Sequence, residues 1–537
     1  MIWHCYCGDC SMNHVAIGKR LNTWNGAVIG MLFFASINSV RSEANLHHLS
    51  ESHASNGVEF EEYKIRSRLP KHATLITGSF LGNASTDIAL ACPTGESKSE
   101  IEIYSDQGKE WNLSLKSSVQ VDIQHLDKGM IQGQEYLAFY TDQGILLFDP
   151  DTKNTKTVIE KELNPENDAI QSISPLDFLR DLNHDGQDDC ILLLPDRIEI
   201  YLQKMDGSFS DAFIIADPSR SEGLDFRREQ IQKIHNVDWN LDQKTDLVFW
   251  QSGEFKVFLQ NEDNRFHIAP TKVSCPIKIQ SVGTGSQQLE KEGDNMMKLL
   301  LGFRKKIKQT ALASFQDLNA DGYSDLITHS LEGRSLLRLK IVIETHMSQP
   351  TPSGIGIPKA AASTVSPSGK QPKEYSNHQF QDLNGDGQLD LILTSVDAGI
   401  GDMFEALTAN TIDLDLEFYL MNNGKYPPKP TTTRRIAPKS HWFSKNGPFF
   451  PSVLIGDING DRFLDLAVGY DWKELRIYEG IQGKTLFAKQ AQKFRVNIPT
   501  NEQNARLVDL NLDGKKDILF HQASPSINQE ITLLITK

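Results

Sequence analysis

Short apolar runs separated by polar turns recur along most of the chain. Each run is rich in leucine, β-branched or aromatic residues, and a second run of the same kind follows after a polar stretch. This spacing predicts adjacent antiparallel strands, because short apolar runs bounded by turn residues are typical of strands. The paired runs are 190–194 with 197–202, 247–250 with 254–259, 326–328 with 337–343, 391–394 with 416–420, 466–469 with 474–478, and 518–520 with 530–536.

An acidic nine-residue loop precedes every one of these pairs. Four copies have the full pattern D-x-N-x-D-G-x-x-D, and two have another residue in place of the glycine. Carboxyl and amide oxygens at positions 1, 3, 5 and 9 suit a hard cation, and calcium takes six to eight oxygen ligands at flexible geometry. The loops therefore predict calcium sites. The complete loops begin at Asp181, Asp317, Asp382 and Asp509, and the two without glycine begin at Asp238 and Asp457.

The candidate metal ligands are the side chains at these four loop positions. In the complete loops they are Asp181, Asn183, Asp185 and Asp189; Asp317, Asn319, Asp321 and Asp325; Asp382, Asn384, Asp386 and Asp390; and Asp509, Asn511, Asp513 and Asp517. Weaker candidates lie in the loops where Gln243 and Arg462 replace the glycine that normally relieves a strained turn. They are Asp238, Asn240, Asp242 and Asp246, and Asp457, Asn459, Asp461 and Asp465.

The loops differ from an EF-hand in two respects. An EF-hand needs a glutamate at loop position 12 and a helix after the loop. Here position 12 is Leu192, Thr328, Leu393 or Phe520 in the complete loops, and a strand is expected to follow. A helical calcium motif is therefore excluded on local grounds.

The repeat extends upstream in two weaker copies. Residues 78–92 and 121–140 keep the spacing of the apolar runs but lack most of the acidic positions. With these two copies the number of units is eight. A repeat of several strands at a period of tens of residues predicts an all-β array, and a β-propeller protects its sheet edges by radial closure. Seven or eight blades are compatible with the pattern, and the direct count favours eight. Three surplus segments, 274–309, 345–378 and 426–452, are expected to form long connections.

The last unit has room for only two strands after its loop. The strand over 58–67 can supply the missing one, so the N- and C-terminal strands are expected to close the ring.

This combination of strand, D-x-N-x-D-G-x-x-D loop and apolar strand resembles FG-GAP or VCBS-type repeats, as in the integrin α-chain propeller and many bacterial secreted proteins. The resemblance covers roughly residues 72–537. It implies several structural calcium ions, with a further backbone carbonyl ligand from loop position 7. Those residues are Gln187, Tyr323, Gln388 and Lys515. The family serves many functions, so the resemblance does not assign one.

The N-terminus has the features of a secretory signal. Lys19 and Arg20 precede an eleven-residue apolar run, 27–37, which is too short to span a bilayer. We therefore expect a signal peptide over 1–44, with Met12 as an alternative start, a linker over 45–57 and the propeller over 58–537. The protein is expected to be secreted, periplasmic or at the cell surface, and not membrane-spanning. Its net charge of −15 argues against nucleic-acid binding.

The sequence contains no P-loop, nucleophile elbow or zinc-binding motif. Residues 431–452 combine basic and aromatic side chains that either pack a connection or contact a ligand; among them are Arg434, Arg435, Lys439 and Phe449. The favoured interpretation is a binding or adhesion module for a glycan or protein. The alternatives are a polysaccharide lyase-like enzyme and a scaffold of an envelope complex.

Overall fold

A computed structural model describes residues 57–537, with gaps. Residues 71, 83–84, 96, 109, 164–172, 217–230, 232, 252, 283–306, 334–339, 368–377, 397–409, 412, 440–448, 450 and 523–528 are not described. The expected signal peptide and nearly all of the expected linker therefore lie outside the described residues. One compact unit comprises Val58–Lys537.

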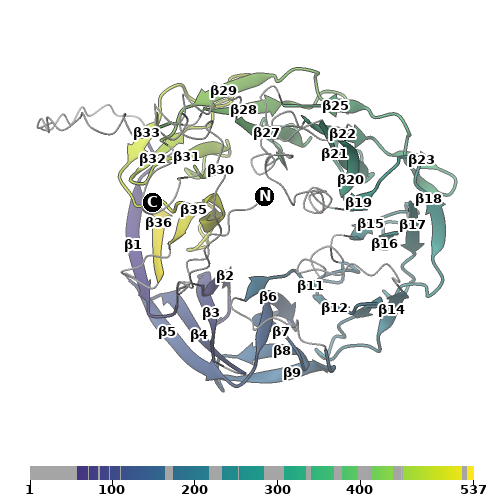
Figure 1. Ribbon diagram of the computed structural model, residues 1–537, viewed down its shortest axis with the longest axis horizontal. Helices are drawn as coiled ribbons and strands as arrows, with labels where there is room; N and C mark the ends of the chain where they lie inside the picture. The colour runs from purple at the N-terminus through teal and green to yellow at the C-terminus, as the bar shows by residue number, and fades with distance from the viewer. Residues whose placement is uncertain are drawn as a thin grey trace, which may run out of the picture. The chain divides into compact units, whose positions relative to one another are not determined.

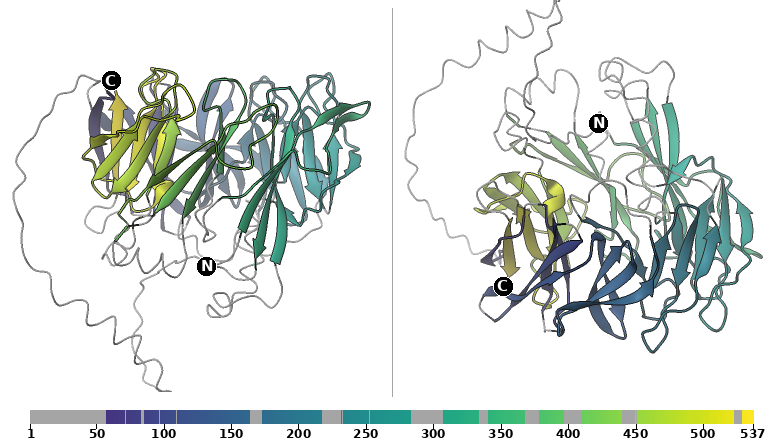
Figure 2. Two further views of the ribbon diagram at one scale, coloured as in Figure 1. Left: turned by 90° about the horizontal axis from the view of Figure 1, so that it is seen from above. Right: turned by 60° about the horizontal axis from the view of Figure 1, so that its bottom comes forward.

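This unit is an all-β propeller of eight blades arranged in a ring (Figure 1). Each blade has four antiparallel strands, ordered from the inner to the outer side of the ring. The strands themselves extend between the two faces of the ring, as Figure 2 shows. The predicted fold class is confirmed, and the count of eight blades is correct.

The first four blades follow one another along the chain. Blade 1 contains β2 (Thr74–Gly78), β3 (Asp87–Gly95), β4 (Lys98–Asp106) and β5 (Trp111–Val119). Blade 2 contains β6 (Ile123–Ile131), β7 (Gln134–Thr141), β8 (Gly144–Asp149) and β9 (Asn154–Glu160), with β10 (Ser174–Pro175) parallel to β6. Blade 3 contains β11 (Leu179–Arg180), β12 (Asp189–Leu193), β13 (Arg197–Tyr201) and β14 (Phe213–Ala216). Blade 4 contains β15 (Ile234–Val237), β16 (Asp246–Gln251), β17 (Glu254–Phe258) and β18 (Thr271–Ser274).

The remaining blades complete the ring. Blade 5 contains β20 (Ile307–Gln316), β21 (Asp325–Gly333), β22 (Lys340–His346) and β25 (Ser363–Val365), with β19 (Ser281–Val282) parallel to β20 and a separate hairpin of β23 (Gln349–Thr351) and β24 (Gly354–Gly356). Blade 6 contains β26 (His378–Gln381), β27 (Asp390–Val396), β28 (Leu414–Tyr419) and β29 (Thr432–Ile436). Blade 7 contains β30 (Val453–Gly456), β31 (Asp465–Asp471), β32 (Glu474–Tyr478) and β33 (Gln492–Phe494). Blade 8 contains β34 (Ala505–Val508), β35 (Asp517–Gln522), β36 (Gln529–Thr536) and, as its outer strand, β1 (Phe60–Ser67); a 3-10 turn, Glu502–Asn504, precedes β34.

Blade 8 is built from both ends of the chain. Strand β1 pairs with β36 in an antiparallel register that runs from Phe60 opposite Thr536 to Ser67 opposite Gln529. The closure expected from the short last unit is therefore confirmed.

The hydrophobic core lies between neighbouring blades. Strand β12 is buried along its whole length, and β16 along all but its last residue. One core cluster joins Ile65 and Leu533 of blade 8 to Leu75 and Ile88 of blade 1. Both faces of these second strands are covered, which is why the sequence shows continuous apolar runs there instead of alternation.

Parts of the segments expected to be long connections are strands. Residues 432–436 form the outer strand of blade 6, and 363–365 form the outer strand of blade 5. Each of these outer strands has a single apolar residue, so their sequences lack the signal of the buried strands. Cys92, Cys190 and Cys275 are free thiols. No helix in the described part of the chain is long and apolar enough to cross a membrane.

Candidate metal loops on one face of the ring

The six acidic loops occupy the same place in six consecutive blades. Each joins the inner strand to the second strand in blades 3 to 8, for example between β26 and β27 in blade 6. Equivalent connections in successive blades emerge on the same side of a propeller, so the six loops lie on one face of the ring.

The loop from Asp382 shows how these side chains are held. One carboxylate oxygen of Asp382 accepts the backbone N–H groups of Gly385 at 2.8 Å and Asp386 at 3.2 Å, and the other accepts that of Gly387 at 2.8 Å. The Asn384 side-chain oxygen accepts the Asp386 N–H at 2.9 Å. Because Asp382 and Asn384 share one donor, oxygens from the first and third positions converge.

The fifth-position aspartate completes this arrangement. The Asn384 side-chain nitrogen donates to one oxygen of Asp386 at 3.0 Å, and the backbone N–H of Gln388 donates to the other at 2.8 Å. The amide oxygen of Asn384 is therefore turned toward the loop interior, and Asp386 is fixed beside it.

The two loops without glycine adopt the same conformation as the others. The residue at position 6 has a positive φ in all six, with 69° at Gln243 and 75° at Arg462 against 84° at Gly387. The position-6 N–H donates to the first aspartate at 2.9 Å in both, from Gln243 to Asp238 and from Arg462 to Asp457. Replacement of the glycine therefore leaves the loop geometry intact and places a side chain in a strained backbone region.

The ninth-position aspartate lies behind each loop and is fully buried in all six. In blade 6, one oxygen of Asp390 accepts the N–H of Leu383 at 3.0 Å, and the other accepts the N–H of Met421 at 2.8 Å. This carboxylate therefore ties the loop to the end of the third strand, β28.

Burial is the main influence on the pKa values of these aspartates. It raises the pKa of Asp189 to about 8, that of Asp325 to about 7, and those of Asp390, Asp465 and Asp517 to about 6, against the backbone N–H bonds that lower them. The negative aspartates of the same loop raise all five pKa values further. A cation beside the loop would reverse that effect.

The donor set fits calcium in its chemistry. The side-chain oxygens of Asp382, Asn384 and Asp386 converge on the backbone of the loop, and each oxygen of the ninth-position carboxylate has a lone pair beyond its backbone hydrogen bond. In the described residues, no three His, Cys, Asp or Glu side chains are gathered closely enough to hold a metal on their own. A cation would therefore need the asparagine oxygen as well, and backbone carbonyl or water oxygens, which calcium accepts readily.

Hydrogen bonds link neighbouring blades beside the loops at three places in the ring. At each, the N–H that precedes the ninth-position aspartate donates to a carbonyl at the first or second position of the loop in the preceding blade. This bond joins Leu389 to Leu318 at 2.8 Å, Lys516 to Asp457 at 2.9 Å, and Thr86 to Leu510 at 2.9 Å. The last of these spans the closure between blades 8 and 1.

The first two blades depart from the loop pattern. In blade 2 a two-residue turn, Gln132–Gly133, with φ of 53° and 76°, replaces the loop. Blade 1 retains a buried Asp87, which accepts the N–H of Leu81 at 2.8 Å. Blade 1 thus keeps the buried aspartate of the ninth loop position but not the acidic residues that precede it in the other loops.

The described basic and aromatic residues of 431–452 have structural roles. Arg434 donates to the carbonyls of Phe487 and Ala488 and stacks over the Tyr478 ring at 4.2 Å, which joins blade 6 to blade 7. Arg435 forms a two-pronged ion pair with Asp415, and Lys439 pairs with Asp471.

Phe449 of the same segment is buried, whereas His441, Trp442, Phe443 and Phe450 lie outside the described residues. The structure therefore supports packing for Arg434 and Phe449, whereas Arg435 and Lys439 are exposed and ion-paired.

Comparison with known proteins gives no family assignment. No family model matches the chain, and no curated protein matches it. Among solved structures, a lectin from Agrocybe aegerita that recognises non-reducing terminal N-acetylglucosamine aligns at 13% identity and a TM-score of 0.35, over 70% of this chain and 80% of the lectin. A putative 6-phosphogluconolactonase from Bacteroides fragilis aligns at 13% identity and a TM-score of 0.31, over 80% of this chain and 97% of that protein. Likeness at this level carries no argument about ligand or activity.

Proposed function

We propose that this protein is an extracytoplasmic, calcium-stabilised β-propeller of the FG-GAP/VCBS type that binds a glycan or protein ligand. The observation that carries the proposal is the recurrence of one oxygen-rich loop, in one conformation, at the same place in six consecutive blades. Closed propellers present rigid faces for ligands, and a loop repeated in this way points to a shared structural ligand and not to a single reaction centre.

The role proposed for calcium follows from electrostatics. Carboxylates about 5 Å apart repel each other by roughly 3 kcal/mol per pair at an effective dielectric constant of ~20. A divalent cation converts that repulsion into attraction. Calcium outside the cytoplasm is abundant, and a site at about 100 times its dissociation constant adds ~2.7 kcal/mol to the free energy of unfolding.

Thermal unfolding with and without calcium tests the proposal. The unit 58–537 is expected to melt at a lower temperature in EDTA, and excess calcium is expected to restore the melting temperature whereas magnesium restores less. Asp386→Asn is expected to reduce the calcium response of its loop, and Asp415→Asn, at an ion pair away from any loop, serves as the control. A melting temperature that is the same in EDTA and in calcium contradicts the proposal.

The binding role has two competitors with different signatures. A lyase would release unsaturated sugars that absorb in the ultraviolet, and a scaffold would co-purify with protein partners without retaining glycans. Arg434 is fixed against blade 7 by two carbonyls and the Tyr478 ring, whereas Arg435 and Lys439 are exposed cations that each pair with an aspartate. A glycan array read for both retention and ultraviolet-absorbing product separates the three.

Export is proposed from the N-terminal segment of the sequence. A fusion of residues 1–57 to a reporter that is active only outside the cytoplasm is expected to give signal, and deletion of the apolar run 27–37 is expected to abolish it. Equal reporter activity with and without that run would contradict export.

A further inference from the structure

Two of the six acidic loops have the dipeptide asparagine–glycine at positions 3 and 4. These are Asn384–Gly385 in blade 6 and Asn459–Gly460 in blade 7. Position 4 has a positive φ in every loop, and in the other four loops it is occupied by His184, Leu241, Ala320 and Leu512. Because the six loops otherwise share one conformation, the two glycines show what changes when the residue after the asparagine has no side chain.

Both glycines bring a backbone N–H to the first carboxylate of their loop. The Gly385 N–H donates to Oδ1 of Asp382 at 2.8 Å, and the Gly460 N–H donates to Oδ1 of Asp457 at 2.7 Å. All six loops lie within the described residues, and only these two have a hydrogen bond from the N–H of position 4 to the carboxylate of position 1. Both distances are in the range of about 2.6–3.2 Å at which a general base takes up a proton.

The neighbouring asparagine amide is held through both of its polar atoms. The side-chain oxygen of Asn384 accepts the Asp386 N–H at 2.9 Å, and its nitrogen donates to Oδ2 of Asp386 at 3.0 Å. Asn459 makes the same two bonds to Asp461, at 2.9 Å and 3.0 Å. A backbone N–H at such a distance stabilises negative charge that develops on a carbonyl oxygen. Each loop thus holds an amide carbon, a backbone nitrogen and a carboxylate together.

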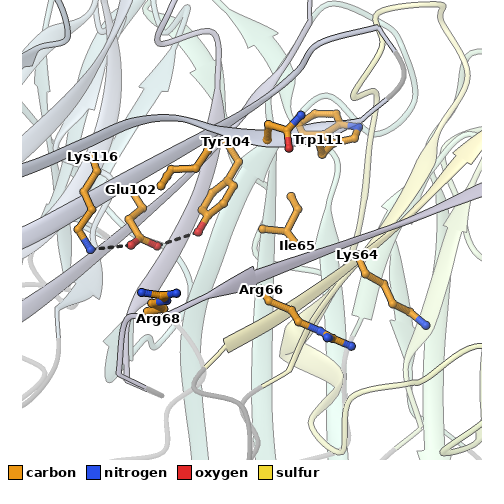
Figure 3. Close-up of a pocket in the computed structure, with 10 residues that line it drawn as sticks. Lys64, Ile65, Arg66, Arg68, Glu102, Tyr104, Trp111 and Lys116 are labelled. Atoms are coloured by element: carbon orange, nitrogen blue, oxygen red, sulfur yellow. Dashed lines mark hydrogen bonds and ion pairs between the residues drawn. The ribbon is translucent and has the colours of Figure 1, made fainter.

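A carboxylate that accepts hydrogen bonds is not reactive on that account. Glu102 lines a pocket of about 480 Å³ between β1 of blade 8 and strands β4 and β5 of blade 1, where it accepts from Tyr104 at 2.8 Å and from Lys116 at 3.0 Å (Figure 3). These side-chain donors fix the wall of the pocket. Asp382 differs because it accepts from a backbone nitrogen that can close a five-membered ring with Cγ of Asn384.

We propose that Asn384 and Asn459 are self-modification sites, at which the asparagine cyclises onto the following glycine. In blade 6, Asp382 takes the proton of the Gly385 nitrogen, and this nitrogen attacks Cγ of Asn384. The new N–Cγ bond forms and the bond from Cγ to the side-chain nitrogen breaks. That nitrogen leaves as ammonia, with the proton that Asp382 gives up. Water then opens the cyclic imide at either carbonyl and yields aspartate or isoaspartate.

The reaction changes the loop permanently. It consumes one water, releases one ammonia and involves no oxidation or reduction. Either product lacks the side-chain nitrogen that donates to Asp386 or Asp461, and either adds a negative charge to its loop. No step uses a metal ion, so the inference is independent of the calcium proposal.

The surroundings of the two glycines differ. Glycine has no Cβ to crowd the attacking nitrogen. Gly385 is exposed, and a Cβ added there would meet no atom within 4 Å, whereas one added at Gly460 would lie 3.1–3.4 Å from carbons of the Lys515 side chain. The ring closes with less hindrance in blade 6, so we expect Asn384 to react faster than Asn459.

Incubation of the folded protein in EDTA, at a temperature below its melting transition, tests the proposal. Peptide mapping by mass spectrometry locates each conversion of amide to acid and separates aspartate from isoaspartate. Modification is expected at Asn384 and Asn459. It is expected to be at least about tenfold slower at the third position of the other four loops, since a positioned base contributes roughly 10²–10⁴-fold. Those residues are Asn183, Asn240, Asn319 and Asn511.

Asn423–Gly424 is the matched control for the dipeptide. Asn423 is exposed in the turn between β28 and β29, and both residues of the pair have a positive φ. Within the described residues, no carboxylate accepts the Gly424 N–H. In the folded protein Asn423 is therefore expected to react more slowly than Asn384. In urea the two rates are expected to converge, because neither dipeptide then has a fixed neighbour.

Two variants separate the base from the dipeptide. Asp382→Asn keeps an oxygen for the Gly385 N–H but takes up no proton, so it is expected to slow modification of Asn384 by at least about tenfold and to leave Asn459 unchanged. Ala320→Gly gives the loop of blade 5 the same dipeptide and is expected to make Asn319 react faster than Asn423.

Three outcomes overturn the proposal. They are a rate at Asn423 in the folded protein that equals or exceeds the rate at Asn384, a rate at Asn384 that Asp382→Asn leaves unchanged or raises, and equally fast modification in a loop without glycine at position 4. Melting curves in EDTA verify that each variant is folded. The rate at Asn459 shows in the same sample that Asp382→Asn acts only in its own loop.

Discussion

Replacement of a ninth-position aspartate tests whether that residue anchors its loop. In Asp390→Asn the side chain keeps one oxygen and gains a nitrogen that faces a backbone N–H. One of the two bonds, to Leu383 at 3.0 Å or to Met421 at 2.8 Å, is then lost. A hydrogen bond to a charged group contributes about 1.5–3 kcal/mol, and a buried N–H left without a partner costs about 1–3 kcal/mol. These two contributions partly describe the same effect, so we expect the free energy of unfolding to fall by about 2–4 kcal/mol.

The assay is urea unfolding at pH 7.5 in EDTA, which removes any contribution of bound metal. Asp386→Asn is the matched control, because it makes the same chemical change at an exposed position of the same loop. We expect it to lose less than about 1 kcal/mol, as exposed hydrogen bonds and ion pairs contribute little.

The pH dependence sharpens the test. Burial raises the pKa of Asp390 in the folded protein to about 6, above its ordinary value of 3.8. Below about pH 6 the folded state therefore binds more protons than the unfolded state, so this residue makes the unmodified protein more stable as pH falls from 7.5 to 5. Asparagine does not titrate, so the difference in stability between the unmodified protein and Asp390→Asn is expected to grow over that range. Equal losses for the two variants in EDTA would refute the anchoring role, and a difference that shrinks at pH 5 would contradict the raised pKa.

Three further predictions concern stability, each read from urea or thermal unfolding. Gln243→Gly is expected to stabilise the protein by about 1 kcal/mol, because Gln243 has a φ of 69°; no gain would show that the loop is unstrained. Gly144→Ala is expected to lower the melting temperature markedly, since the added Cβ would lie 2.0 Å from the Ile159 carbonyl oxygen; an unchanged melt would contradict that close approach. Burial, with a smaller effect of Arg180, lowers the pKa of His235 to about 4, so its folded state binds fewer protons than its unfolded state between about pH 4 and 6.5. The contribution of His235 to the free energy of unfolding is thus complete above pH 6.5 and falls by up to about 3 kcal/mol toward pH 4. His235→Phe is expected to reduce the loss of stability between pH 6.5 and 4. An equally large loss in the variant would exclude His235 as its cause.

The buried parts of this fold were predictable because both faces of the second strand in a blade are covered. Continuous apolar runs such as 190–194 and 518–520 mark the second strands β12 and β35, and the acidic loop fixes the boundary before each of them. The short last unit also predicted closure by β1, which pairs along its whole length with β36.

The outer strands were missed for the opposite reason. In β29 only Ile436 is buried, and the other residues are polar and partly exposed, so no periodic apolar signal marks the strand. Likewise, nothing in the sequence places Ser67 beside Glu102, because the hydrogen bond between them depends on how blade 8 meets blade 1. The candidate metal residues followed from local spacing alone, whereas the anchoring role of the ninth position appears only with the third strand in place.

Closure by β1 also dictates the order in which the chain reaches its native state. Gln529 in β36 donates to the Pro70 carbonyl across 459 residues of sequence, so β1 lacks its pairing strand until β36 has been made. At about 5–20 residues per second, synthesis leaves β1 waiting for tens of seconds while blades 1 to 7 assemble. Such a long-range pairing carries a large loop-closure entropy and slows the final step. The seam between the two ends of the polypeptide is therefore the last part of the ring to form, and an interruption of synthesis anywhere before β36 leaves an open arc with two unmatched edges.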